Sequence, residues 1–566
     1  MAGSIPKPRA PKWAAIAGVI AIICTACSAT PATNAPAGSG SAPTATPAAA
    51  TSSVDTSQLV ILTSSLGSQQ YAPAETDSGV APIKNAVGET LIRENRVTRV
   101  YEPGLALSWD QSADGLTLDI KLRPNIPFQD GYGDVTADDV KFTIVQYLGP
   151  SSDVGNQAQA MLEGLGGDPA KNVEVVGPLE LKLHSPKFTV GLLPALADGS
   201  TANAMYIQSK KYWTDKPADA LVHPIGTGPY KFVSSTPGTE VKLTAVENHW
   251  RQTATFKNVT LRVIPDDAAR LAQVESGAAD LAVIPGNLVG EAKAKTNLKI
   301  LGATDFAQAE VELGGQYPGY PYDDPTAPWI QRAAPEKGLA IRQALSLAID
   351  RQAILDAVLA GQATLTTGPI TQYPKIPDRN LPNWTLPVFD ATQAKAKLAE
   401  GGFPNGFPIT VQEFENRPGS GQADIAEAVA GYWEAIGIKV TRLQLTDEQS
   451  DSYVDKPPKT QGAAWIRLDP FYDNPVQNFQ CCYSVPAGHQ EMYDPIFDKN
   501  LALMQAEPDP VKRAALNNEI IQKMIDNMSI IPMFTLDWSV AAGTKVGKWD
   551  NLTGEGNINS IESITP

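Results

Sequence analysis

The stretch LALSWDQSADGLTLDIKLRPNIPFQDGYGDVTADDVKFTI, residues 105–144, decides the fold class. Within it, every second residue of LTLDIKL (116–122) is apolar, which predicts a half-buried strand. The sequence TADD (136–139) then places a hydroxyl three residues before a carboxylate, the spacing of a helix capping box. Apolar residues follow at helical spacing over 140–148. This stretch therefore predicts a strand followed by a capped helix.

Strands and helices continue to alternate on both sides of this stretch. TLRVIP (260–265) and ADLAVIP (279–285) predict strands on either side of a helix over 267–276, as in a βαβ unit. Further helices are predicted over 341–349, 424–436 and 508–528, and Asp350 and Asp390 are expected to cap two more. A hairpin is predicted over 173–183, and further strands over 58–63, 408–414, 438–445 and 530–536. The predicted fold class is therefore α/β.

The length and the charge of the chain restrict its architecture and its partners. The chain has 566 residues, and single cores stop growing near ~250–300 residues, so two large lobes are expected. Its formal net charge is −16. Nucleic-acid binding needs a basic face, so a nucleic-acid partner is not expected. The same charge disfavours an anionic substrate attracted at long range.

The N-terminus resembles an export signal. Basic residues in the first 12 positions precede an apolar run (13–24), and Thr25 and Ala26 then precede Cys27. The run is too short for a good membrane span and fits a signal peptide. The small residues before Cys27 resemble a bacterial lipobox, although Cys24 replaces the usual leucine, and this resemblance implies lipid attachment at Cys27. An uncleaved anchor or ordinary signal cleavage remain alternatives, and each places the body outside the cytoplasm.

The segment after this signal and the remaining cysteines carry no predicted chemistry. Residues 28–56 are rich in Ala, Pro, Ser and Thr and predict a disordered linker. Cys481 and Cys482 are adjacent, so a disulfide between them would need a strained backbone. The four histidines are scattered without i, i+4 pairing. No metal site and no cofactor are predicted.

Several blocks in a fixed order resemble one protein family. In addition to residues 105–144, they are PIGTGPYKFV (224–233), ENHWR (247–251), RLAQVESGAADLAVIP (270–285), IRQALSLAIDRQAIL (341–355), GQATLTTGPI (361–370), FDATQAKAKLAEGGFPNGF (389–407) and IGIKV (436–440). Together they resemble the family 5 extracellular solute-binding proteins, the peptide- and nickel-binding group of ABC importers. The resemblance covers about residues 57–566. Most residues of these blocks, including the Gly226–Gly228 turn, are expected to be scaffold.

The resemblance implies a two-lobe fold of the periplasmic-binding-protein type II, in the large cluster with an extra subdomain in lobe 1. Lobe 1 would comprise residues 57–300 and 533–566, and lobe 2 residues 301–532. The chain would cross between the lobes near 300–306 and near 529–536. The lobes would close around a solute, and the closed monomer would dock on an ABC permease in the membrane.

The resemblance also implies a binding site. In peptide-binding members, an aspartate in a G-W-x-x-D pattern holds the ammonium of the peptide, and the matching stretch here is AAWIRLDPFYDNP (463–475). Trp465 fits the family tryptophan, Ala464 replaces the glycine, and Asp469 lies one residue later than the pattern. The expected ligand-binding residues are Gln69 and Tyr71 in the loop after the first strand, Trp465, Arg467, Asp469 and Tyr472 in this stretch, and Phe534 on the returning strand.

The sequence leaves other solutes and one other function class open. It contains no G-x-S-x-G, H-E-x-x-H or G-x-x-x-x-G-K-[ST] motif, so an enzyme is not expected. A surface sensor or adhesin with the same fold is an alternative to a transport protein. An oligosaccharide, haem or a metal chelate are alternatives to a peptide, which remains the expected solute.

Overall fold

The computed structural model describes residues 54–73, 78–95, 100–149, 164–188, 190, 192–198, 204–318, 323–366, 368, 385–415, 419–446, 449, 461–470, 476, 494–550 and 558–566. Outside these residues lie the predicted signal peptide with Cys27, most of the predicted linker, Tyr472, Cys481 and Cys482.

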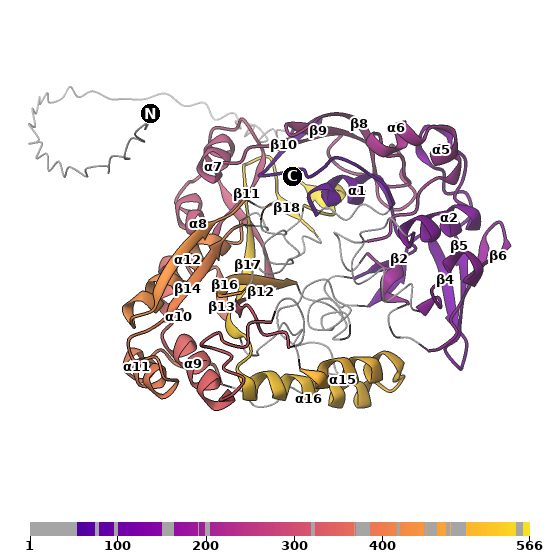
Figure 1. The fold of residues 1–566 in the computed structure, drawn as a ribbon. Coiled ribbons are helices and arrows are strands. Elements are labelled where there is room, and N and C mark those ends of the chain that lie inside the picture. The colour runs from indigo at the N-terminus through magenta and orange to yellow at the C-terminus, as the bar shows by residue number, and fades with distance from the viewer. Residues whose placement is uncertain are drawn as a thin grey trace, which may run out of the picture. The chain divides into compact units, whose positions relative to one another are not determined.

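The main sheet joins strands from the two ends and the middle of the chain (Figure 1). In the described residues its order is β15 (Lys439–Gln444), β14 (Pro408–Glu413), β16 (Ala463–Pro470), β12 (Lys299–Leu313), β17 (Ile531–Ala542), β11 (Leu281–Ile284), β1 (Gln58–Thr63), β10 (Asn258–Val263), β9 (Glu240–Ala245) and β8 (Tyr230–Thr236), with β13 (Ala363–Leu365) also paired to β17. Strand β1 lies parallel to both β10 and β11, and helix α7 (Asp267–Glu275) connects the latter two. The predicted βαβ unit is therefore confirmed.

A second sheet has a core of its own. It contains β4 (Ala106–Gln111), β5 (Thr117–Leu122), β7 (Glu180–His184) and β6 (Val173–Gly177), in that order. Its buried side chains pack with helix α2 (Ala137–Tyr147) in a hydrophobic cluster separate from the main one. Thr136 and Asp139 form the predicted capping box at the start of α2, with Thr136 Oγ1 2.7 Å from Asp139 Oδ2. This separate core matches the extra subdomain expected in the first half of the chain.

Helices cover the strands of the second half of the chain. In Figure 1, α8, α12 and α10 flank the orange and yellow strands, and α15 and α16 lie side by side. Besides α2 and α7, the described residues form the helices α1 (Ala81–Val87), α4 (Pro169–Asn172), α5 (Lys210–Asp215), α6 (Pro217–Val222), α8 (Gly286–Lys293), α9 (Pro335–Leu347), α10 (Arg351–Ala357), α11 (Ala391–Glu400), α12 (Gln422–Ala435), α15 (Pro495–Ala506) and α16 (Pro510–Asn527). The predicted caps are confirmed: Asp350 accepts from Ala353 N at 3.0 Å, and Asp390 from Gln393 N at 2.8 Å.

Two long strands connect the two halves of the main sheet. β12 pairs with β17 over both ends of its length. Along its other edge, β17 pairs first with β13 and then with β11. Ala303 pairs with Trp538 and Ala307 pairs with Leu536. The β12 segment between these pairs is longer than the β17 segment opposite it, so the register shifts there. A bulge of this kind bends a strand and interrupts its ladder of hydrogen bonds.

Candidate functional site

The predicted site stretch forms an interior strand of the main sheet, between β14 and β12. β16 pairs antiparallel with β12, so that Trp465 lies opposite Glu312, Arg467 opposite Glu310, and Asp469 opposite Gln308. Residues directly opposite each other on antiparallel strands point to the same face of the sheet, and alternate residues share that face. These residues therefore form one polar face, which we call the β12–β16 face: Gln308, Glu310, Glu312, Trp465, Arg467 and Asp469.

The side chains of the β12–β16 face are buried. Glu310, Glu312 and Asp469 have no exposed surface, and the Arg467 side chain is 12% exposed. The Arg467 guanidinium forms an ion pair with the Asp469 carboxylate, two residues further along the same strand. An arginine can hold a carboxylate rigidly through charge-assisted hydrogen bonds. The strand therefore presents a positioned pair of opposite charges in a desolvated place.

Hydrogen bonds hold the side chains of Gln308 and Glu310 on β12. Gln308 Nε2 donates to Glu310 Oε2 and to the Gly368 carbonyl, both at 3.3 Å. Burial raises the pKa of Glu312 to about 8, against the opposing effect of Arg467 and with a further increase from Asp469. Glu312 is therefore largely protonated near neutral pH, because the charged form is poorly solvated there.

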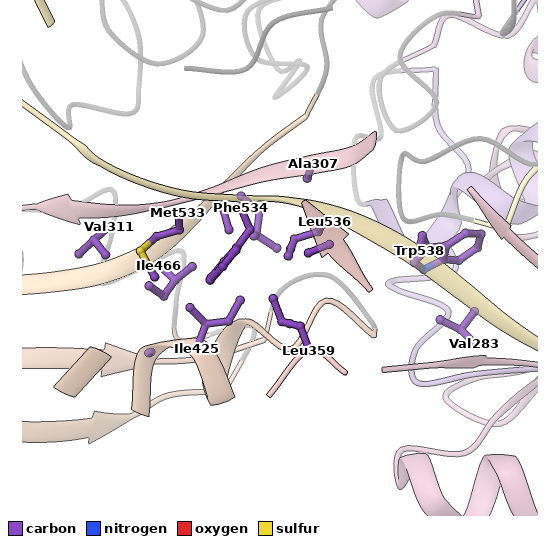
Figure 2. Packing of buried hydrophobic residues seen from close by; sticks show 14 of the residues in the cluster. Val283, Ala307, Val311, Leu359, Ile425, Ile466, Met533, Phe534, Leu536 and Trp538 are labelled. Carbon is purple, nitrogen blue, oxygen red and sulfur yellow. The ribbon is translucent and has the colours of Figure 1, made fainter. Parts of the chain in front are cut away.

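Phe534 points away from this face. It lies opposite Ala309 on β17, and Ala309 itself lies opposite Leu468, so Phe534 belongs to the other face of the sheet. Its side chain has no exposed surface, and Figure 2 shows it directed toward Leu359 and Ile425 in the hydrophobic core. The structure thus brings Trp465, Arg467 and Asp469 together and places Phe534 on the opposite side of the sheet.

Gln69 and Tyr71 lie in the loop after β1 and are also buried. Tyr71 packs edge-on against Phe232, with the ring centroids 5.9 Å apart, and its amide donates to the Leu221 carbonyl at 2.9 Å. Within the described residues, neither the Gln69 amide nor the Tyr71 hydroxyl has a hydrogen-bond partner. A ligand contact for these two residues stays a prediction.

Two of the buried acidic residues were not predicted from the sequence. The segment AQAEVEL (307–313) alternates apolar and polar residues, a pattern that normally indicates a strand with one face in water. The structure instead buries both faces of this segment. The sequence alone therefore gives only one indication that Glu310 and Glu312 belong to the site: both are glutamates on the same face of a strand, and that strand pairs with the predicted site strand.

Among the described residues, no group of three or more His, Cys, Asp or Glu side chains is arranged to hold a metal ion. In the same part of the chain, no helix combines the length and the apolar character needed to cross a membrane.

The chain is similar to solute-binding proteins both in sequence and in structure. The family model for bacterial extracellular solute-binding proteins, family 5, matches residues 100–484. Heme-binding protein A of Haemophilus influenzae is 28% identical over 60% of this chain and 61% of its own length. The oligopeptide-binding protein AppA of Bacillus subtilis is 30% identical over 64% of this chain and 65% of its own length. The chain thus spans less than two thirds of these relatives.

A solved structure extends the likeness to the fold. The ABC transporter-associated periplasmic binding protein DppA of Helicobacter pylori, in complex with the peptide STSA, superposes with a TM-score of 0.70 at 20% identity. The match covers 90% of this chain and 98% of that chain, and it confirms the predicted two-lobe α/β fold. The family also confirms the prediction of a binding protein in place of an enzyme. The chain belongs to the bacterial extracellular solute-binding proteins of family 5.

Proposed function

We propose that this protein captures a small solute at the β12–β16 face and delivers it to an ABC permease in the membrane. The observation that carries this proposal is the fully buried Asp469, which is ion-paired with Arg467 on the same strand. Two buried charges are poorly solvated, so a site that exposes them to a ligand gains strong, directional interactions. Asp469 would accept hydrogen bonds from a cationic group of the solute, and Arg467 would bind a carboxylate.

The solute we favour is a peptide. A free peptide has an ammonium at one end and a carboxylate at the other, which match Asp469 and Arg467 in charge. Trp465 and Tyr472 would stack on its side chains. AppA, one of the more similar relatives, is named an oligopeptide-binding protein, which supports this choice.

Buried polar atoms without partners support a bound solute. Within the described residues, Trp465 Nε1, both polar atoms of the Gln69 amide and the Tyr71 hydroxyl have no hydrogen-bond partner. Buried polar groups are nearly always paired in folded proteins, so these atoms call for a partner. All three residues were predicted as ligand contacts, and a solute that reaches them would satisfy these groups.

Capture would involve closure of two lobes. We assign residues 57–300 and 533–566 to lobe 1 and residues 301–532 to lobe 2, which places the crossings on β12 and β17. The bulge between Ala303 and Ala307 lies on the first crossing. Hinges are usually a few residues whose backbone torsion angles change when two lobes move. Because a bulge interrupts the hydrogen bonds between strands, it favours such a change.

The proposed location is the outer side of the cell membrane. The basic N-terminal residues, the apolar run 13–24 and the small residues before Cys27 support export and lipid attachment at Cys27. The protein would act there as a monomer that contacts the membrane through its lipid and its permease.

Haem is a second candidate solute, because heme-binding protein A is among the relatives. A thermal-shift screen of the purified protein with di-, tri- and longer peptides, amino-blocked peptides, oligosaccharides, haem and nickel–histidine separates these candidates. A ligand at 100 times its Kd stabilises by about 2.7 kcal/mol.

The peptide proposal requires stabilisation by free peptides that is lost when the amino end is blocked. Asp469→Asn should abolish the shift, whereas Asp110→Asn, the same change at an exposed position of β4, should leave it intact. A shift with haem or a sugar that Asp469→Asn leaves unchanged would reject both the solute and the site.

A further inference from the structure

Glu312 is a fully buried carboxylate that lacks a hydrogen bond. It has no exposed surface, and within the described residues neither of its carboxylate oxygens has a hydrogen-bond partner. Trp465 lies directly opposite on β16, and its indole nitrogen also lacks a partner there. A buried acceptor and a buried donor therefore border the same place on the β12–β16 face, and each is costly to leave unpaired.

The charged residues of this face come from two neighbouring strands. Glu310 and Glu312 from β12 and Asp469 from β16 are acidic, and Arg467 is the basic residue that shares this face with them. Alternate residues on a strand lie ~7 Å apart, so all four groups act on one another. The Arg467 guanidinium is already ion-paired with Asp469. An ionised Glu312 would therefore add a negative charge to this face, which a positive group of a ligand would neutralise.

The residues around Glu312 determine its protonation state when no ligand is bound. Burial raises its pKa to about 8, so it holds a proton at neutral pH. Besides the charged neighbours named above, β14 presents Gln412 opposite Trp465, and β17 presents Thr535 opposite Gln308. Neither residue is charged, so neither of these strands compensates an ionised Glu312.

We propose that Glu312 receives a primary ammonium or a guanidinium group of the solute, so that this binding site selects organic cations. The proposal rests on the function proposed above and narrows its solute class. The net charge of −16 favours the approach of a cation at long range. The described carboxylates are not arranged for a metal ion, which leaves a cation with N–H donors.

Several classes of compound contain a primary ammonium or a guanidinium group, and matched probes distinguish between them. Ala-Ala-Ala offers a terminal ammonium, N-acetyl-Lys-Ala-Ala and N-acetyl-Arg-Ala-Ala offer a side-chain cation, and spermidine is a free amine. N-acetyl-norleucyl-Ala-Ala matches the lysine probe but has an uncharged side chain, and we call it the neutral probe. The probe that binds most tightly identifies the source of the cation.

The test is titration calorimetry of the purified full chain at pH 7 in two buffers with different ionisation enthalpies. We expect at least one cationic probe to bind, the neutral probe to fail, and binding to release up to about one proton from Glu312. Glu312→Gln should weaken binding of the cation by roughly 10- to 100-fold and abolish the proton release. Glu336→Gln, the same change at an exposed position of α9, should alter neither.

The outcomes separate this inference from the function on which it rests. Equal binding of the neutral and cationic probes, or binding of none of them, overturns the selection of cations. Binding that is lost in Asp469→Asn but unchanged in Glu312→Gln, without proton release, overturns the role of Glu312 and leaves the proposed function standing. Binding that neither substitution affects overturns both. The proton release is measured on the unsubstituted protein and decides the question even if Glu312→Gln does not fold.

Discussion

Arg251 Nε donates a hydrogen bond to the Glu89 carboxylate over 2.8 Å. The same guanidinium donates through Nη2 to Glu562 at 3.0 Å. The side chains of Glu89 and Glu562 are 7% and 6% exposed. One arginine thus satisfies two buried carboxylates that are separated by most of the sequence.

Arg251→Met should destabilise the protein strongly. The substitution leaves Glu89 and Glu562 buried without their cation, and breaking a buried pair in this way costs about 3–5 kcal/mol. Urea unfolding at pH 7 measures the loss. Arg262→Met is the matched control, because Arg262 pairs at 3.9 Å with Glu240 where both side chains reach solvent, and such pairs contribute about 1 kcal/mol or less. Equal losses in the two variants would contradict the buried network.

The stability of the protein should depend on pH through Glu89. Burial raises the pKa of Glu89 from 4.5 to about 7, although Arg251 acts in the opposite direction. A carboxyl with a raised pKa in the folded state binds its proton more tightly than in the unfolded state. Its contribution is therefore complete below pH 4.5 and is lost as the pH rises through 7.

Glu89→Gln isolates this contribution. Between pH 4.5 and 7, the free energy of unfolding of the unsubstituted protein should fall relative to the variant by up to about 3 kcal/mol. Parallel urea titrations at several pH values give the difference. A difference that stays constant, or that grows in the other direction, would show that Glu89 is ionised in the folded state throughout this range.

Phe534 should act in the core and not at the solute. Phe534→Ala removes a ring that packs against Leu359 and Ile425, which should cost about 3–5 kcal/mol. Phe534→Leu retains most of the apolar contact and should fold with a smaller loss. In Phe534→Leu, calorimetry should give an unchanged Kd for any solute that binds the unsubstituted protein. A large loss of affinity without a comparable loss of stability would support the predicted ligand contact instead.

The sequence predicted local structure well because its signals are local. The capping box at Thr136 and the aspartate caps at 350 and 390 depend on residues three positions apart, and the structure has them all. The pair Arg467 and Asp469 was also predictable as two residues on one face of a strand. Helix α15 was missed, and its neighbour α16 was found within two residues of its bounds.

The partners of the site strand could not be predicted in the same way. Period-two alternation in AQAEVEL (307–313) shows which side chains share a face but not whether that face meets water or protein. The run IIPMFTL (530–536) does not alternate, so the face of Phe534 was undetermined. Pairing of β12 with β16 and β17 joins residues more than 150 positions apart, and no local pattern specifies such a register.

The turn at Gly226 and Gly228 should tolerate no side chain. A Cβ at Gly226 would collide with the Val87 carbonyl oxygen, and one at Gly228 would lie 2.6 Å from the Ala86 carbonyl oxygen. His249 Nε2 also bonds the Thr227 carbonyl at 2.8 Å, so the turn is held from both sides and cannot move away. Gly226→Ala should therefore destabilise by about 3 kcal/mol.

Gly290→Ala provides the contrast, since a Cβ at this position of α8 would meet no atom within 4 Å. A glycine inside a helix is about 1 kcal/mol less favourable than alanine, so this substitution should stabilise the protein by roughly that amount. Urea unfolding of the two variants tests both expectations. A neutral result for Gly226→Ala would mean that the turn can relax away from α1, and the family block around it would then need an explanation other than close packing.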